Sequence, residues 1–404
     1  MNRYITIICA LTGCLMFSAC SKYATRGDIK GAAYLRVFND IPFTLDLTTK
    51  TDVVPFFTML IDPTFDKNGV PAGGQVVGDY LGSRLIFDPS TAVNEGNPVG
   101  TPLDTSTRYN INYEYPGNAH VLAAPSINGL DLSAWAQVSS GKHRILFIAR
   151  PQNDIDFAQL SDTIRNSVII DTTVNLQEGE VYTMETVLQD VDAVKYGLYL
   201  RQESFTHQTF DLSKNYVTFF NLSGKNSSLS SNSISPTSQY FYDTMNVSYT
   251  YYDPTLPGGS AGIQGFQNVY LMTMEGRMTA SAPFLPLPVL PLSSFYDNTG
   301  VLKTYSGDAG VTYGTMPYFV FDFIASGNNI PASSTGQAYM LSCEWDPITV
   351  NTLTSQQLQN FNGNVNANLN MLVQVDGKTA VFPAVYVMEL VFNQIFIMQV
   401  QQKI

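Results

Sequence analysis

Short apolar segments, five to eight residues long and bounded by turn residues, recur along the chain. They are rich in β-branched and aromatic residues, which is typical of β-strands. We expect strands at 34–39, 144–149, 167–171, 181–188, 196–200, 216–221, 269–274, 318–324 and 385–392. Helical periodicity is limited to 354–363 and, more weakly, 156–166. Because no long helices separate the strands, the pattern predicts antiparallel sandwiches rather than parallel βαβ units.

Two pairs of segments resemble each other and occur in the same order. The opening segment YLRVFND at Tyr34 matches YVTFFNL at Tyr216. The later segment EVYTMETVLQD matches AVYVMELVFNQ, which aligns Glu185 with Glu389 and Tyr182 with Tyr386. Two matches in the same order predict a duplicated domain. A general likeness between unrelated β-strands is the alternative.

The repeats divide the chain into two β-sandwich domains, at 32–205 and 214–404. The boundary lies in the polar segment 201–215, which precedes the second opening strand. Side chains alternate across a strand, so Leu35 and Val37 share one face of the first opening strand. Val217 and Phe219 share the matching face of the second, and we expect both pairs to face a core.

The N-terminal segment has the three parts of a signal peptide. Arg3 precedes an apolar run at 4–17, and the small residues Ser18 and Ala19 follow it. This run is shorter than the ~20 residues of a transmembrane helix. We therefore expect a signal peptide at 1–19 and a flexible tether at 20–31.

The segment Phe17-Ser18-Ala19-Cys20 resembles a bacterial lipobox, although Phe17 stands where leucine is usual. This resemblance implies that Cys20 is acylated, becomes the first residue of the mature chain and anchors the protein in a membrane. An ordinary secretory signal with an incidental cysteine is the alternative. After cleavage only Cys20 and Cys343 remain, so neither a disulfide framework nor a cysteine metal site is expected.

The composition is poor in charge and acidic overall. Charged residues make up 13% of the chain, against ~25% in an average soluble protein. The formal net charge is −12, and Lys and Arg form no cluster. Nucleic acid is therefore not an expected partner.

The first half resembles a repeat domain of unknown function that is widespread in surface lipoproteins of Bacteroidota. The likeness rests on SSGKHRILF and on the Gly-x-x-Tyr-Thr pattern at 179–183, and it covers about 32–202. It extends more faintly to the second half. It implies tandem immunoglobulin-like β-sandwiches in the cell envelope, anchored to the outer membrane and facing the surface or the periplasm. It implies no activity.

Candidate catalytic and metal-binding motifs are weak. His120, His143 and His207 have no metal-binding spacing, and His143 is expected to be a turn residue. The G-x-S-x-G match at 258–262 lies in a Pro/Gly loop with no helix after it. Segment 64–69 resembles a calcium loop but lacks its first Asp and its bidentate Glu, so a turn is preferred and a weak calcium site stays open. We expect no catalytic residue, metal or cofactor.

Aromatic residues are concentrated at 238–254. On strands, Tyr240 and Tyr242 would share one face, and Tyr249 and Tyr251 would share another. These four rings are the candidate ligand-binding residues, because rings stack on sugar or peptide planes. The alternative is that one face belongs to a core and the other lines a neighbouring sheet.

Together these features predict a non-catalytic, lipid-anchored envelope protein that binds a glycan or a protein partner. A fimbrial subunit is the alternative, with the apolar C-terminal run at 385–400 exchanged between subunits. A hydrolase with an unrecognised pair of carboxylates is a third and less favoured reading.

Overall fold

The protein is all-β in a computed structural model. The structure describes residues 28–41, 56–82, 84, 87–88, 114–116, most of 119–224, 244–252, 263–275, 283–288 and the shorter segments whose strands are given below. Within these residues the helical elements are short: α2 (Asp162–Arg165) and the 3-10 turns η2 (Phe157–Gln159) and η3 (Ser204–Thr206). None of the described helices has the length and apolar character needed to cross a membrane.

All nine predicted strands are present. The strands of the first half are β1 Ala32–Asn39, β2 Phe57–Phe65, β3 Pro71–Leu81, β4 Phe87–Asp88, β5 Glu114–Tyr115, β6 Ala136–Ser139, β7 Gly141–Ala149, β8 Val168–Leu176, β9 Val181–Asp190 and β10 Lys195–Gln202. Those of the second half are β11 Lys214–Asn221, β12 Thr244–Tyr252, β13 Val269–Glu275, β14 Leu285–Pro288, β15 Thr304–Ser306, β16 Thr312–Gly314, β17 Tyr318–Ala325, β18 Gln337–Ser342, β19 Ala367–Asn368, β20 Leu372–Val375, β21 Lys378–Val381, β22 Ala384–Val391 and β23 Gln394–Gln401.

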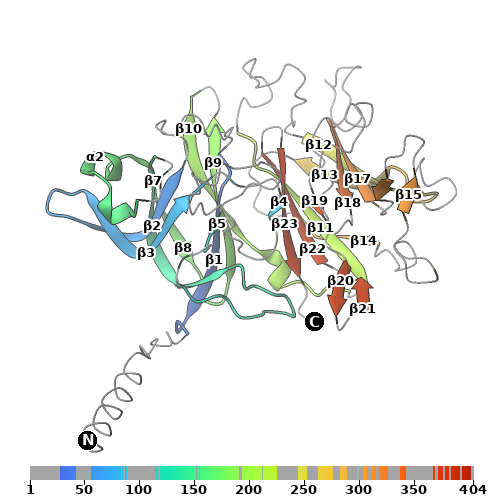
Figure 1. The fold of residues 1–404 in the computed structure, drawn as a ribbon, viewed down its shortest axis with the longest axis horizontal. Helices are drawn as coiled ribbons and strands as arrows, with labels where there is room; N and C mark the ends of the chain where they lie inside the picture. Colours follow the sequence, from blue (N-terminus) through green and yellow to red (C-terminus); the bar gives the residue numbers. More distant parts are fainter. Residues whose placement is uncertain are drawn as a thin grey trace, which may run out of the picture.

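Four sheets are layered across the molecule and follow one another from left to right in Figure 1. The first outer sheet has the order β3-β2-β7-β8, and the first inner sheet has the order β10-β9-β1-β5, with β6 also paired to β1. The second inner sheet has the order β14-β11-β22-β23-β4, and the second outer sheet has the order β13-β12-β17-β18-β19. The pairs β15–β16 and β20–β21 form two small hairpins.

The two halves have the same strand order and the same central register. In the first inner sheet Tyr34 lies opposite Val181, and in the second Tyr216 lies opposite Val385. The outer sheets also correspond, since β3-β2-β7-β8 in one matches β13-β12-β17-β18 in the other. These are the segments that the sequence repeats align.

The expectation of purely antiparallel sheets is wrong for the inner sheets. β1 pairs with β9 in parallel, and β11 pairs with β22 in parallel. No helical crossover is needed, because the chain between the two strands of each pair passes through the outer sheet of its own half. The absence of long helices in the sequence therefore excluded βαβ units but not parallel pairing.

Three hydrophobic cores separate the four sheets. Leu35 and Val37 lie in the core between the first outer and inner sheets, as predicted. Val217 and Phe219 lie in the equivalent core of the second half. A third core fills the space between the two inner sheets and includes Phe38, Phe205, Trp135, Phe220, Val385 and Val387. Both faces of each inner sheet are therefore buried.

One segment of the first half joins the second. β4 pairs in parallel with β23, so that Phe87 lies opposite Ile397 and Asp88 opposite Met398. Arg84, which lies three residues before β4, is anchored to the first half, because its backbone N–H donates to the carbonyl oxygen of Asn39 at 2.8 Å. The shared core and this strand tie the two halves together.

Some local features have a direct sequence cause. β14, in the proline-rich segment, is an edge strand next to β11, because proline has no backbone N–H to donate to a second neighbouring strand. β20 and β21 pair with Val375 opposite Lys378. The weak helix at 156–166 forms only η2 and α2. The helix predicted at 354–363 lies outside the described residues.

The polar segment at 201–215 begins inside the molecule. Arg201, Glu203, Phe205 and Thr206 are buried, and Phe205 packs edge-on against Trp135 and Phe284 at centroid distances of 5.9 and 6.2 Å. The sequence placed a domain boundary in this segment because it is polar, and charged and amide residues are usually at the surface. The stretch at 201–206 is buried and is part of the contact between the halves.

Candidate functional site

The main concentration of charged side chains in the described residues lies between the two inner sheets. We call it the buried charge network, and its members are Asp40, Arg84, Glu185, Arg201, Glu203 and Glu389. Each residue is at most 5% exposed. Asp40 follows β1, Glu185 lies on β9, and Arg201 lies on β10 with Glu203 just after it. Glu389 comes from β22, and Arg84 precedes β4.

Arg201 binds three carboxylates at once. Its Nη1 lies 3.0 Å from Glu185 Oε1, and its Nε donates to Glu203 Oε1 at 3.0 Å. Its Nη2 donates to Glu389 Oε1 at 2.5 Å. The fork of a guanidinium suits such multiple contacts, and the third one crosses from the first half to the second.

Arg84 binds the other oxygen of the same glutamate. Its Nη1 donates to Glu389 Oε2 and lies 3.5 Å from Asp40 Oδ2. The guanidinium also stacks over the Phe38 ring, 3.7 Å from its centroid. Glu389 is therefore held from both sides by arginines that belong to the first half of the chain.

The surroundings shift the acidities in opposite directions. Burial opposes ionisation of Glu389, but the attraction of Arg84 and Arg201 outweighs it and lowers the pKa of Glu389 to about 2. Burial raises the pKa of Asp40 to about 7, because Arg84 compensates it only in part and the charge of Glu389 repels it. Burial also raises the pKa of Glu185 well above its usual value. One carboxyl is thus strongly ionised, while two resist ionisation.

A metal ion does not fit the network well. In the described part of the chain, Asp40, Glu185 and Glu389 are the one group of three side chains spaced closely enough to surround a cation. Both oxygens of Glu389 already accept from guanidinium groups. A cation placed there would be repelled by Arg84 and Arg201, so the chemistry of the site favours protons.

Sequence reasoning identified the Glu185–Glu389 pair only as equivalent positions in two repeats. In the structure both are completely buried at the same interface. Arg201 and Arg84 gave no signal, because a charge that alternates with apolar residues normally indicates a solvent face. The alignment of two glutamates in otherwise apolar strands was the one available indication.

Two of the four candidate tyrosines are core residues, which corrects the prediction for them. Tyr249 and Tyr251 are 5% and 6% exposed, and both belong to the core of the second half. Tyr251 packs against Phe319 and Phe266 at centroid distances of 5.4 and 6.1 Å. They do share one face, but that face is turned toward the core between β12 and the inner-sheet strands β11 and β22 rather than toward a ligand. Tyr240, Tyr242 and Cys20 lie outside the described residues.

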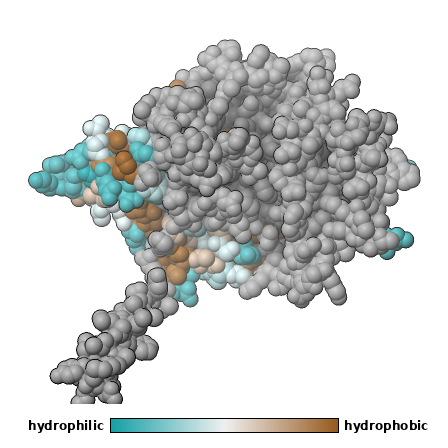
Figure 2. Space-filling view, viewed as in Figure 1, coloured by the Kyte–Doolittle hydropathy of each residue, from teal (hydrophilic) through white to brown (hydrophobic). Residues whose placement is uncertain are grey.

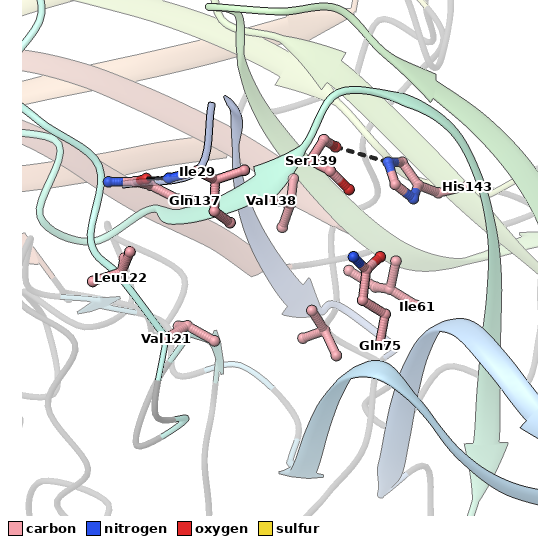
Figure 3. Close-up of a pocket in the computed structure, with 10 residues that line it drawn as sticks. Ile29, Ile61, Gln75, Val121, Leu122, Gln137, Val138, Ser139 and His143 are labelled. Atoms are coloured by element: carbon pink, nitrogen blue, oxygen red, sulfur yellow. Dashed lines mark hydrogen bonds between the residues drawn. The ribbon is translucent and has the colours of Figure 1, made fainter. Parts of the chain in front are cut away.

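His143 lies beside a small cavity of about 40 Å³ (Figure 3). Its Nδ1 lies 2.7 Å from Asp62 Oδ2, and its Nε2 donates to the carbonyl oxygen of Ser139 at 2.7 Å. Gln75 and Gln137 also line the cavity, together with aliphatic side chains. A space of this size holds a few water molecules. His143 is therefore a satisfied structural residue, but it lies on strand β7 and not in the turn that the sequence predicted.

The segment that resembles a calcium loop is a hairpin turn between β2 and β3. Asp66 Oδ1 accepts from the backbone N–H groups of Asn68 and Val70, at 2.8 and 3.0 Å. Its other oxygen lies 3.7 Å from Arg165 Nη2. The carboxylate is committed to the turn, as preferred from the sequence.

A second polar cluster fixes the segment that contains η2 to the first outer sheet. Arg150 pairs with Asp79, and Asp79 accepts the backbone N–H of Phe157 at 2.8 Å. Arg150 Nη2 also donates to Asn153 Oδ1 at 3.0 Å. These contacts explain why 156–166 lies over β2 and β7 although it forms little helix.

Comparison with known proteins gives little guidance. No protein family matches the chain, and no curated protein sequence does either. One structural match is described as a "putative cell adhesion protein" from Bacteroides uniformis. It is 9% identical, and the match covers 93% of this chain and 100% of that one, but the TM-score is 0.15. A score this low does not establish that the two proteins share a fold.

Proposed function

We propose that this protein is a non-catalytic, lipid-anchored component of a bacterial cell envelope that binds a glycan or a protein. The observation that carries the proposal is the position of the buried charge network. Its carboxylates lie between two sheets and bind arginines of the same chain. They serve the scaffold, and a rigid scaffold of paired sandwiches is suited to present loops and edges to a partner.

We infer that the two halves are duplicated immunoglobulin-like sandwiches. The equal strand orders and the equal registers of β1–β9 and β11–β22 support this. A further match supports it too: Ile41 N–H donates to Asn39 Oδ1, and Ser223 N–H donates to Asn221 Oδ1, at equivalent places after β1 and β11.

Lipidation of Cys20 is the first test. The apolar run that ends at Ser18, Ala19 and Cys20 motivates it. Radiolabelled palmitate should enter the wild-type protein and not Cys20→Ala, and the variant should leave the membrane fraction. A matched Cys14→Ala variant, which alters a cysteine inside the apolar run, should keep the label. Equal labelling of wild type and Cys20→Ala would refute the anchor.

Exposed aromatic rings are the best candidates for ligand contact. Among the described residues, Tyr270 is 61% exposed and Phe65 is 43% exposed. Phe65 lies at the end of β2, on the hairpin that projects from the first half, where Figure 2 shows a mainly hydrophilic surface. Tyr240 and Tyr242 remain candidates.

A glycan array and a pull-down from envelope extracts test the binding. We expect at least one of three variants to lose the interaction. They are Tyr270→Ala, Phe65→Ala and the double variant Tyr240→Ala, Tyr242→Ala. Val194→Ala, at another exposed apolar residue, should leave it intact. Turnover on a glycoside or peptide panel that a single carboxylate substitution abolishes would favour a hydrolase instead.

The fimbrial alternative loses its main sequence support. The C-terminal run forms β22 and β23, and β22 lies inside its sheet between β11 and β23. Exchange of this run between subunits would open two cores of the molecule.

A further inference from the structure

We propose that the solvent face of β12 and β13 around Tyr270 is a binding site for a neutral glycan. The proposal rests on the proposed function, because it assigns a ligand class and a place to the binding suggested there. The site is an exposed ring with hydroxyl and amide groups beside it, and we call it the Tyr270 platform. Its members are Tyr270, Asn246, Ser248, Asn268 and Thr273.

A β-bulge brings Tyr270 and Thr273 to the same face of β13. Side chains three residues apart on a regular strand point to opposite faces. The register between β12 and β13 shifts here, and Leu271 is the extra residue. Leu271 and Met272 both pack against the core of the second half, which leaves Tyr270 and Thr273 on the solvent side. Bulges often re-aim a side chain beside a functional site.

Hydrogen bonds hold the exposed ring in place. The Thr273 hydroxyl donates to Asn246 Oδ1 at 2.8 Å, and the Tyr270 oxygen lies 2.7 Å from Thr273 Oγ1. A hydroxyl has one hydrogen, and that of Thr273 is given to Asn246, so Tyr270 is the donor to Thr273. The ring is thus tied along β13, although Tyr270 is 61% exposed. A ring that is fixed before binding loses little conformational entropy when a ligand stacks on it.

The same hydrogen bonds leave polar groups that suit a sugar. The Tyr270 oxygen keeps its lone pairs as acceptors, and the Asn246 amide keeps two N–H donors, for which the described residues provide no partner. Asn268 is exposed two residues before the ring, and its backbone N–H is tied to Thr250 Oγ1 at 3.0 Å. A sugar has apolar C–H faces and a rim of hydroxyls, so an aromatic ring bordered by donors and acceptors matches both.

The absence of charge in the Tyr270 platform favours a neutral glycan over an anionic one. Its members are tyrosine, asparagine, serine and threonine residues, and the strands β12, β13 and β17 contain no lysine or arginine. The charged residues paired with β12 are Asp322, opposite Ser248, and Glu275, opposite Thr244. Both are acidic, so an anionic sugar would gain no cationic partner from these three strands.

The matching face of the first half is built differently. Leu60, Leu146 and Ile148 lie on β2 and β7 of the first outer sheet and pack against Phe157 and Leu160 of the segment that contains η2. That face is apolar and covered, whereas the face of β12 and β13 is polar and holds an exposed ring. The outer sheets have the same strand order, so equivalent surfaces differ in this way. The second half is therefore the one that offers a surface to a polar ligand.

The test is a glycan array probed with the full-length protein, followed by titration calorimetry. The neutral probes are oligosaccharides of glucose, mannose, galactose and N-acetylglucosamine, and the anionic probe is oligogalacturonate. Wild type should bind a neutral probe and not the anionic one.

Three variants test the parts of the site. Tyr270→Ala removes the stacking surface and should weaken binding about tenfold or more. Tyr270→Phe and Thr273→Val each release the ring from its hydrogen bond and should weaken binding about fivefold. Thr173→Val is the matched control, because it makes the same change at an exposed residue of β8, an edge strand of the first outer sheet, and it should bind as wild type does.

The outcomes separate this site from the proposed function. Neutral-glycan binding that Tyr270→Ala leaves unchanged would overturn the site and leave the proposed binding function standing. A wild type that binds only oligogalacturonate, or no glycan, would overturn the ligand class. A protein captured from envelope extracts by wild type and lost with Tyr270→Ala, without glycan binding, would make the platform a protein contact instead. No partner in either experiment would refute the proposed function itself.

Discussion

Glu389 and His143 are buried polar residues held by specific partners, and such partners determine which substitutions matter. Each of these two side chains binds two partners. Removing one member of such a group leaves a donor or a charge without compensation. The effect of a substitution therefore depends on the partners left behind more than on the residue removed.

Glu389→Ala should be strongly destabilising. It would leave Arg84 and Arg201 facing each other without the carboxylate that compensates both. Breaking a buried ion pair by removing one partner costs about 3–5 kcal/mol. Urea unfolding at pH 7 should show this loss, whereas Glu178→Ala, at an exposed site, should stay within about 0.5 kcal/mol of wild type. A Glu389→Ala protein as stable as that control would contradict the role of the network.

His143→Ala should cost about 1–3 kcal/mol, because Asp62 and the Ser139 carbonyl would each lose a hydrogen-bond partner. His207→Ala is the matched control. Its ring also lies 2.7 Å from a carboxylate, Glu180, but its side chain is 57% exposed and water can replace the contact. Equal losses of stability in the two variants would show that burial does not make the hydrogen bonds of His143 more important than those of an exposed histidine.

At the scale of strands, the two halves come close together where the backbone that follows β11 approaches β9 at Gly224. A Cβ atom at Gly224 would lie 1.9 Å from the carbonyl oxygen of Leu188. Two backbones meet there, so neither can move without shifting its sheet.

Gly224→Ala should therefore destabilise the protein. If the strands shift apart to make room, we expect a loss of about 1–3 kcal/mol, which is typical of overpacking, and a larger loss if they cannot shift. Gly73→Ala is the control, because a Cβ there would meet only the Thr64 hydroxyl at 3.5 Å. Thermal unfolding of both variants checks the prediction. A stable Gly224→Ala protein would mean that β9 and the segment after β11 are not in close contact.

At the scale of the whole molecule, the two halves share one core. The core between the inner sheets draws residues from β1 and β9 on one side and from β11, β22 and β23 on the other. The domain boundaries predicted from sequence stay a prediction, but a cut at 201–206 would have to reach buried residues. Separated halves would each expose one face of an inner sheet to water.

We expect the protein to unfold in a single cooperative transition. Calorimetry and circular dichroism should give coincident curves, and tryptophan fluorescence, which reports on Trp135 in the shared core and on Trp345, should follow them. Phe205→Ala, which removes a ring between Trp135 and Phe284, should lower the midpoint without splitting the transition. Two separate transitions, or two stable fragments after limited proteolysis, would show that the halves fold independently.

The sequence by itself determined the positions of nine strands and one face of each opening strand. Leu35, Val37, Val217 and Phe219 were assigned correctly, because alternation along a strand is a local property. The same alternation placed Tyr249 and Tyr251 among candidate ligand contacts, and it gave no sign that the charges of Arg36, Glu185 and Arg201 are buried. Only the packing of one inner sheet against the other decided that these charges are buried. Burial depends on which sheet faces pack against each other. A local pattern of polar and apolar residues does not show which strands, distant in sequence, will form those faces.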